Sequence, residues 1–150
     1  MTRVKDIIGD KFDVKHCKGA LKSYESALGS VKADKRSKFD MKIFLLLERL
    51  SKGGKISRES APGISASSLG LEGEYPKEGK LPKHKGQHGD DFFYAVKKLP
   101  VRGYFWFSTR VSNTYFVSHY IKKDFDTLSK EDTEKVGNNW RRIEVDKHES

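Results

Sequence analysis

The chain has 150 residues, which suffice for one domain with a real core and exclude two domains of ordinary size. Hydrophobic residues make up 35% and charged residues 34%, a balance typical of a small soluble domain with a heavily solvated surface. Lysine and arginine outnumber aspartate and glutamate by 30 to 21, and the resulting charge of +9 indicates a polyanionic partner, either nucleic acid or an anionic membrane surface.

The cysteine content and the apolar runs indicate a compartment. The single cysteine, Cys17, excludes a disulfide within the chain and favours a reducing environment, and we expect it to be a small buried residue. Residues 1–12 contain no apolar run long enough for a signal peptide, and the run at 43–47 is far too short to span a bilayer. We therefore expect a cytoplasmic protein without a membrane partner.

Two helices are predicted in the first third of the chain. Apolar residues recur at helical spacing over 13–31, with Gly29 as a plausible end. A second helix is predicted from Ser37, which can cap it, with Asp40 in the other half of a capping box and a stop at 53–54. The apolar face of this second helix consists of Phe39, Ile43, Leu46, Leu47 and Leu50.

Residues 55–90 have a different composition, with three of the four prolines and many glycines, and they predict a long surface loop. Its basic cluster consists of Lys80, Lys83, His84, Lys85 and His88. The two histidines have a metal-ligand spacing only on a helix, and Gly86 and Gly89 argue against a helix here. We expect no metal site; a loop that contacts phosphate and a merely solvated loop both remain open.

The last third predicts a sheet followed by a helix. Strands with aromatic and β-branched residues are predicted at 91–98, 101–109 and 114–123. Residues 112–113 suit a hairpin turn, and Ser129 with Asp132 resembles the capping box of a C-terminal helix. The predicted fold is α+β, a single domain over 1–150 in which two N-terminal helices pack on a small antiparallel sheet, with a C-terminal helix.

The predicted hairpin combines cationic and aromatic side chains on one face. A two-residue turn at 112–113 would place Trp106 opposite His119 and Arg102 opposite Lys123. The shared face then contains Arg102, Trp106, Arg110, Tyr115, His119 and Lys123. Cations bind phosphates and aromatic rings stack on unpaired bases, so this face suits single-stranded RNA. A sheet face with ordinary protective charges is the alternative.

Several segments resemble one protein family. RGYFWF at 102–107, SHYIKKD at 118–124 with LSKEDTEKV at 128–136, and FLLLERLSKGG at 44–54 are similar to motifs of the RelE/HigB-like toxins of type II toxin–antitoxin systems. The resemblance covers roughly residues 15–145. It implies an endoribonuclease that needs neither metal nor cofactor, acts on mRNA, often on the ribosome, and is bound by a cognate protein antitoxin.

The resemblance and the hairpin pattern together predict the site. The expected catalytic residues are Arg102, His119, Tyr120 and Lys123. The expected RNA-binding residues are Lys83, Lys85, Lys97, Lys98, Trp106, Arg110 and Lys122. Arginine and lysine would stabilise the phosphorane, and His119 or Tyr120 would transfer protons or stack on a base. The alternative is a non-catalytic member of the same fold that binds nucleic acid or protein, such as a ParE-like toxin that poisons gyrase.

Overall fold

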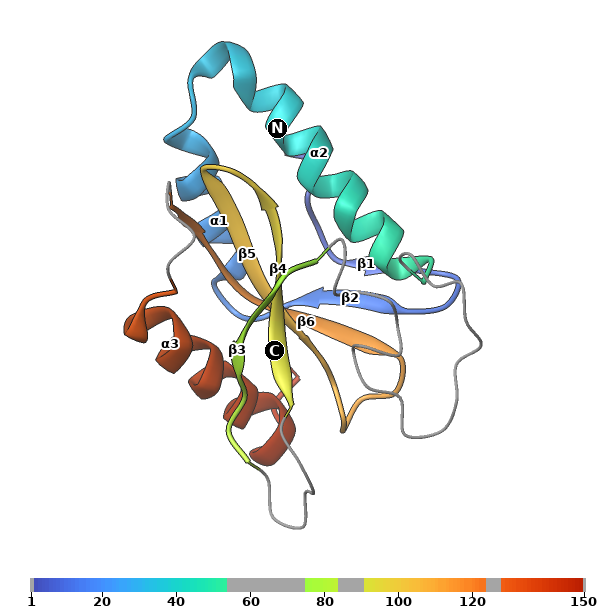
Figure 1. Ribbon diagram of the computed structural model, residues 1–150. Coiled ribbons are helices and arrows are strands. Elements are labelled where there is room, and N and C mark those ends of the chain that lie inside the picture. The colour runs from blue at the N-terminus through green and yellow to red at the C-terminus, as the bar shows by residue number, and fades with distance from the viewer. Residues whose placement is uncertain (1, 54–74, 84–90, 124–127, 150) are drawn as a thin grey trace.

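The computed structural model describes residues 2–53, 75–83, 91–123 and 128–149. These residues form an α+β structure around one mixed sheet (Figure 1). Its strands are β1 (Ile7–Ile8), β2 (Asp13–His16), β3 (Lys77–Lys80), β4 (Phe92–Lys98), β5 (Val101–Phe107) and β6 (Thr114–Lys122), in the spatial order β1-β2-β6-β5-β4-β3. The helices are α1 (Ala20–Gly29), α2 (Ala33–Ser51) and α3 (Lys130–Trp140), and α3 continues into the π-helical η1 (Arg141–Val145).

The central strands are buried on both faces because helices pack on each side of the sheet. Tyr94, Val96 and Phe105 belong to a core with α1 and α2, whereas Phe93 and Trp106 belong to a second core with α3 and η1. Neighbouring residues of a strand point to opposite faces, so the two cores alternate along β4 and β5. Figure 1 shows the strands lying between the α1–α2 pair and α3.

The predicted antiparallel sheet after two N-terminal helices is wrong in two respects. β1 and β2 precede α1, and β2 pairs in parallel with β6, with Val14 beside Tyr115. The predicted helix at 13–31 therefore begins too early: 13–16 is a strand, and Gly19, at a positive φ of 85°, separates it from α1. A four-residue strand whose partner lies about a hundred residues later leaves little local pattern.

The expected register between β5 and β6 is also wrong. The connection is longer than two residues, since β5 ends at Phe107 and β6 begins at Thr114. A bulge follows, because Tyr104 pairs with His119 but Phe105 pairs with Val117, which leaves Ser118 as the extra residue.

The longer connection shifts the partner of Trp106 by three residues, from the expected His119 to Phe116. The bulge reverses one residue of this shift, so Arg102 lies opposite Ile121 rather than Lys123.

Element boundaries were predicted with mixed success. α1 ends at Gly29 as predicted, and Ser129 caps α3 through Asp132 N–H. α2 instead begins at Ala33, with no side-chain cap, so the capping box at Ser37 is wrong. Residues 77–80 of the predicted loop form an edge strand, while 54–74 and 84–90 lie outside the described residues. No helix within the described part of the chain is long and apolar enough to cross a membrane.

Candidate functional site

Four lysines gather where β4 and β6 end beside the β4–β5 turn. Lys97 and Lys98 end β4, Lys122 ends β6, and Lys123 follows it. The register places Lys98 and Lys122 on either side of Val101, and Lys123 N–H donates to the carbonyl of Pro100 at 2.6 Å. Lys122 is exposed and the other three are partly buried. We call Lys97, Lys98, Lys122 and Lys123 the lysine rim.

Arg102 lies beneath this rim rather than on it. The side chain is fully buried, and its Nη1 donates to Oε1 of Glu78 at 2.6 Å in an ion pair. Glu78 comes from β3, within the segment that was predicted to be a loop. The structure therefore does not present Arg102 to a phosphate. Its guanidinium is paired with a carboxylate and out of contact with solvent, where it supports the sheet.

His119 is held in a hydrogen-bonded chain between β6 and α3. Its Nε2 lies 2.9 Å from Oδ1 of Asp132, and its Nδ1 lies 2.8 Å from Oγ of Ser118. Asn139 donates its amide N–H to the same Ser118 oxygen, at 2.9 Å, so Ser118 O–H donates to Nδ1 and His119 donates from Nε2. Burial lowers the pKa of His119, which favours this neutral form. Both ring nitrogens are occupied, so the predicted proton transfer by His119 lacks a free nitrogen.

Asp132 links this chain to the lysine rim. One of its oxygens is bonded to His119, and the other accepts from Oγ of Ser129 at 2.7 Å. Nζ of Lys123 lies 4.0 Å from that second oxygen and makes no hydrogen bond to any residue that the structure describes. The Lys123 ammonium is thus buried beside the Asp132 carboxylate, without a hydrogen bond among the described residues.

Tyr104 belongs to the same cluster and was not predicted from the sequence as a site residue. Its hydroxyl is buried and makes no hydrogen bond among the described residues. Burial, with the nearby Asp132 carboxylate, raises the pKa of Tyr104 to about 12, and the Arg102 guanidinium acts in the opposite direction. Its place in the RGYFWF motif was a usable signal, whereas Glu78 stood in a segment with no pattern.

Comparison with models of protein families, with curated proteins and with solved structures finds no match to this chain. The resemblance to the RelE/HigB-like toxins therefore stays a prediction that depends on the motifs alone. Among the described residues no group of three or more histidine, cysteine, aspartate or glutamate side chains is placed to hold a metal ion.

The aromatic side chains of the hairpin that were predicted to contact RNA are instead packed in the two cores. Trp106 is fully buried and stacks on Phe116 at 5.7 Å between ring centroids, so it cannot stack on a base. Tyr120 is 2% exposed, and its hydroxyl is 2.8 Å from Nε2 of His16. Burial raises the pKa of Tyr120 well above its usual range. The burial of Trp106 and Tyr120 does not favour the predicted base stacking and proton transfer.

Arg110 fastens the C-terminal segment to the end of the hairpin. Its Nε donates to the carbonyl of Ile143 at 2.6 Å, and its Nη2 donates to the carbonyl of His148 at 2.9 Å. Of the two lysines predicted in the loop, Lys83 is exposed, and Lys85 lies outside the described residues. The structure therefore brings together only the lysine rim, with Arg102 and His119 as buried supports.

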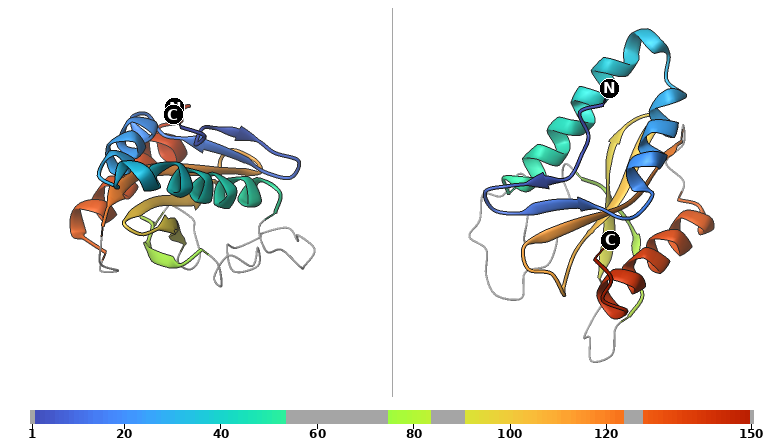
Figure 2. Two further views of the ribbon diagram at one scale, coloured as in Figure 1. Left: turned by 90° about the horizontal axis from the view of Figure 1, so that it is seen from above. Right: turned by 180° about the vertical axis from the view of Figure 1, so that it is seen from behind.

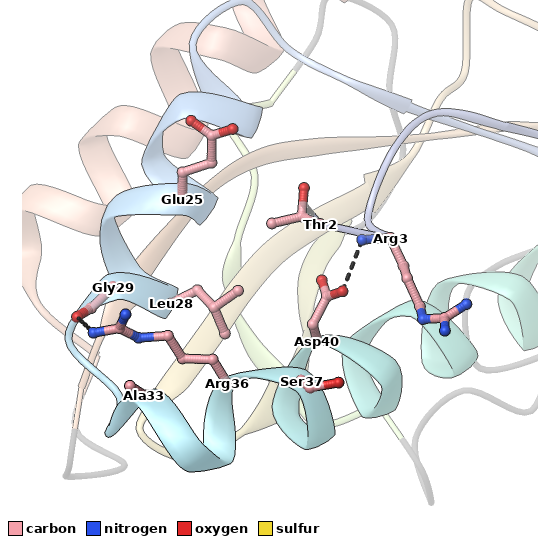
Figure 3. A pocket seen from close by; sticks show the side chains of 9 residues that line it. All are labelled: Thr2, Arg3, Glu25, Leu28, Gly29, Ala33, Arg36, Ser37 and Asp40. Carbon is pink, nitrogen blue, oxygen red and sulfur yellow. Dashed lines mark hydrogen bonds between the residues drawn. The ribbon is translucent and has the colours of Figure 1, made fainter.

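A cavity of about 690 Å³ lies away from the rim, between Thr2–Arg3 and the α1–α2 pair (Figure 3). Asp40 accepts from Arg3 N–H at 2.7 Å and from the Tyr24 hydroxyl at 2.7 Å, and Arg36 donates to the Gly29 carbonyl at 2.7 Å. These charged groups tie the N-terminal segment and the two helices together. The cavity is therefore lined by residues that make structural contacts, and no lysine of the rim belongs to its lining.

Proposed function

We propose that this chain is an endoribonuclease of the RelE/HigB-like toxin type, which cleaves mRNA at the lysine rim in the cytoplasm without a metal ion. The observation that supports the proposal most is the meeting of two motif segments. KK at 97–98, which precedes the RGYFWF motif, and KK at 122–123, within SHYIKKD, lie on opposite sides of β5 at one end of the sheet. Clustered cations of this kind bind a phosphodiester backbone.

The proposed reaction needs three functions from the site. The 2′-oxygen of the substrate bonds to the adjacent phosphorus while the bond to the 5′-oxygen breaks, giving a 2′,3′-cyclic phosphate and a 5′-hydroxyl end. A base accepts the 2′-proton, cations stabilise the phosphorane, and an acid protonates the leaving 5′-oxygen. Lys123 is the candidate for the second and third functions and Asp132, 4.0 Å away, is the candidate proton acceptor. The Lys123 ammonium is buried and the Asp132 oxygens are engaged by His119 and Ser129, so both side chains must turn toward the substrate before they act.

Recognition under this proposal depends on the RNA backbone more than on the bases. Trp106, Tyr104 and Tyr120 are buried and offer no stacking surface. The lysine rim also presents a cationic surface to which an acidic segment of a protein antitoxin would bind by charge, in competition with RNA.

The test is controlled expression of the wild type and Lys123→Met, with mapping of 5′ ends in cellular mRNA. This substitution keeps an unbranched stem of similar length and removes the charge. Lys135→Met, an exposed change on α3, is the matched control. We expect new ends with the wild type and the control, and their loss with Lys123→Met. Intact mRNA in the presence of folded wild-type protein would overturn the proposal.

A binding-only function is the second candidate, and one observation favours it. His119 and Tyr120, the side chains expected to move protons, are both buried and engaged in hydrogen bonds. A non-catalytic protein, such as a toxin that poisons gyrase, needs only the cationic surface. Growth arrest with intact mRNA and induced DNA damage would support this function.

A further inference from the structure

A row of exposed residues runs along the solvent side of α2, and all but one are cationic. The row consists of Lys35, Lys38, Lys42, Leu45 and Arg49, which we call the cationic ridge. The steps of three and four residues place them on one side of the helix, roughly opposite the buried Ile43, Leu47 and Leu50. At 1.5 Å per residue the ridge is about 21 Å long. Figure 2 shows α2 on the outside of the molecule.

The charges on this ridge oppose the stability of the helix that carries them. Lys35, Lys38 and Lys42 are like-charge neighbours at three- and four-residue spacing, which destabilises a helix. Lys35 and Arg36 also lie near the N-terminus of α2, where the helix dipole favours anions. A helix face that was merely solvated gains stability from interspersed glutamates. The arrangement therefore favours a polyanionic ligand over a purely solvated face.

Few carboxylates of α2 oppose the ridge. Asp40 is buried and accepts hydrogen bonds from the Tyr24 hydroxyl and from a backbone N–H. Glu48 lies 3.7 Å from Lys52, which is outside the ridge. Asp34, in the first turn, is the remaining acidic residue of the helix. The field along the middle of the ridge is therefore positive.

The cationic ridge and the lysine rim both lie at α2. The Lys98 ammonium lies over the ring of Phe39, 5.3 Å from its centroid, and Phe39 follows Lys38 of the ridge. Lys98 is also the last residue of β4 and a member of the rim. Lys98 thus places the rim against the core-facing side of α2, while the ridge lies on the solvent side of the same helix.

We propose that the cationic ridge docks the phosphate backbone of double-helical RNA. The large apolar side chains that are exposed in the described part of the chain are Ile8, Leu21, Leu45, Leu99 and Val145, and none of them is aromatic. Sites for unpaired strands combine cations with aromatic stacking, whereas duplex RNA is bound through its phosphates and shape. The choice of RNA over DNA rests on the proposed function, whereas binding of a duplex to the ridge does not depend on whether the rim cleaves a strand.

The test measures binding of a labelled RNA duplex of about 20 base pairs, long enough to exceed one helical turn. Fluorescence anisotropy at several salt concentrations compares the wild type with Lys38→Gln/Lys42→Gln. The control, Lys130→Gln/Lys135→Gln, removes the same charge from exposed positions of α3 on the other face of the sheet. We expect the negative slope of log K against log salt to become shallower by roughly 1 to 2 for the ridge variant, because each lost phosphate contact removes about 0.9 from its steepness. The control should keep the wild-type slope.

Three results would overturn the inference. Equal losses in the ridge and control variants would show that only net charge matters. An equal or tighter ridge-dependent affinity for a single strand of the same length would exclude a duplex ligand. Poly-glutamate that displaces the duplex at equal charge concentration would indicate an acidic protein. Because these readouts measure binding, an absence of mRNA cleavage would remove the proposed nuclease and leave the ridge result standing.

Discussion

Replacing Arg102 by alanine should lower the free energy of unfolding substantially rather than selectively remove a catalytic group. The Arg102 side chain is 0% exposed, that of Glu78 is 11% exposed, and Nη1 and Oε1 are 2.6 Å apart. Arg102→Ala removes a buried side chain and leaves the Glu78 carboxylate without this cation in a site from which water is largely excluded.

The magnitude follows from that burial. Breaking a buried ion pair by removing one partner costs about 3–5 kcal/mol, whereas an exposed pair contributes about 0–1 kcal/mol. A domain of this size has a free energy of unfolding of roughly 5–15 kcal/mol, so the substitution removes a third or more of a typical value. We therefore expect the urea midpoint of Arg102→Ala to fall well below that of the wild type.

Urea unfolding followed by circular dichroism measures the effect, with Lys122→Ala as the exposed control expected within about 0.5 kcal/mol of the wild type. A cycle with Glu78→Ala isolates the pair: the double variant should lose less than the sum of the single losses. A loss below about 1 kcal/mol for Arg102→Ala would refute the reasoning, because it would mean that Arg102 is solvated in solution and available to a phosphate.

Four other substitutions test the interior of the fold. Tyr115→Phe should raise the free energy of unfolding by about 1 kcal/mol, because the Tyr115 hydroxyl is buried without a hydrogen bond among the described residues. Tyr24→Phe should lower the free energy of unfolding, because it removes a hydrogen bond of 2.7 Å to the Asp40 carboxylate. Gly103→Ala should cost about 1–3 kcal/mol in the same urea assay, since its Cβ would lie 2.4 Å from the Tyr120 ring; an unchanged midpoint would show that the ring moves freely. Burial lowers the pKa of His119 below 6.5, so on acidification the unfolded chain binds this proton before the folded chain does. Stability should therefore fall as the pH drops below about 6.5. The midpoint of thermal unfolding should fall less between pH 7 and 5 for His119→Gln than for the wild type.

Local pattern was enough to predict most of the regular elements. β4, β5 and β6 each contain a run of aromatic and β-branched residues between polar ends, and the apolar stripe of α2 has the helical period. β2 was not predicted, because its four residues pair with β6, which lies far along the chain and leaves no local pattern. β3 escaped it because KEGK contains no apolar residue at all.

The site was harder to predict than the fold, because burial of a polar face depends on what covers it. The alternation of β5 correctly groups Arg102, Tyr104 and Trp106, but the same face receives α3 and η1, which no strand pattern reveals. The connection over 108–113 and the bulge at Ser118 then change the partners across the hairpin. The lysine rim was accessible to prediction, since its residues end strands whose positions the sequence indicates.

The parallel pairing of β2 with β6 has a consequence for the nascent chain. Lys15 lies beside Phe116, so the ribosome must add about 100 residues after β2 before this neighbour exists, roughly 5–20 s at usual elongation rates. Until then Val14 has no β6 beside it, and His16 lacks the Tyr120 hydroxyl. Because both members of the KK pair at 122–123 also come late, an interrupted chain would carry neither a closed sheet nor a complete lysine rim. Such fragments would be targets for proteolysis.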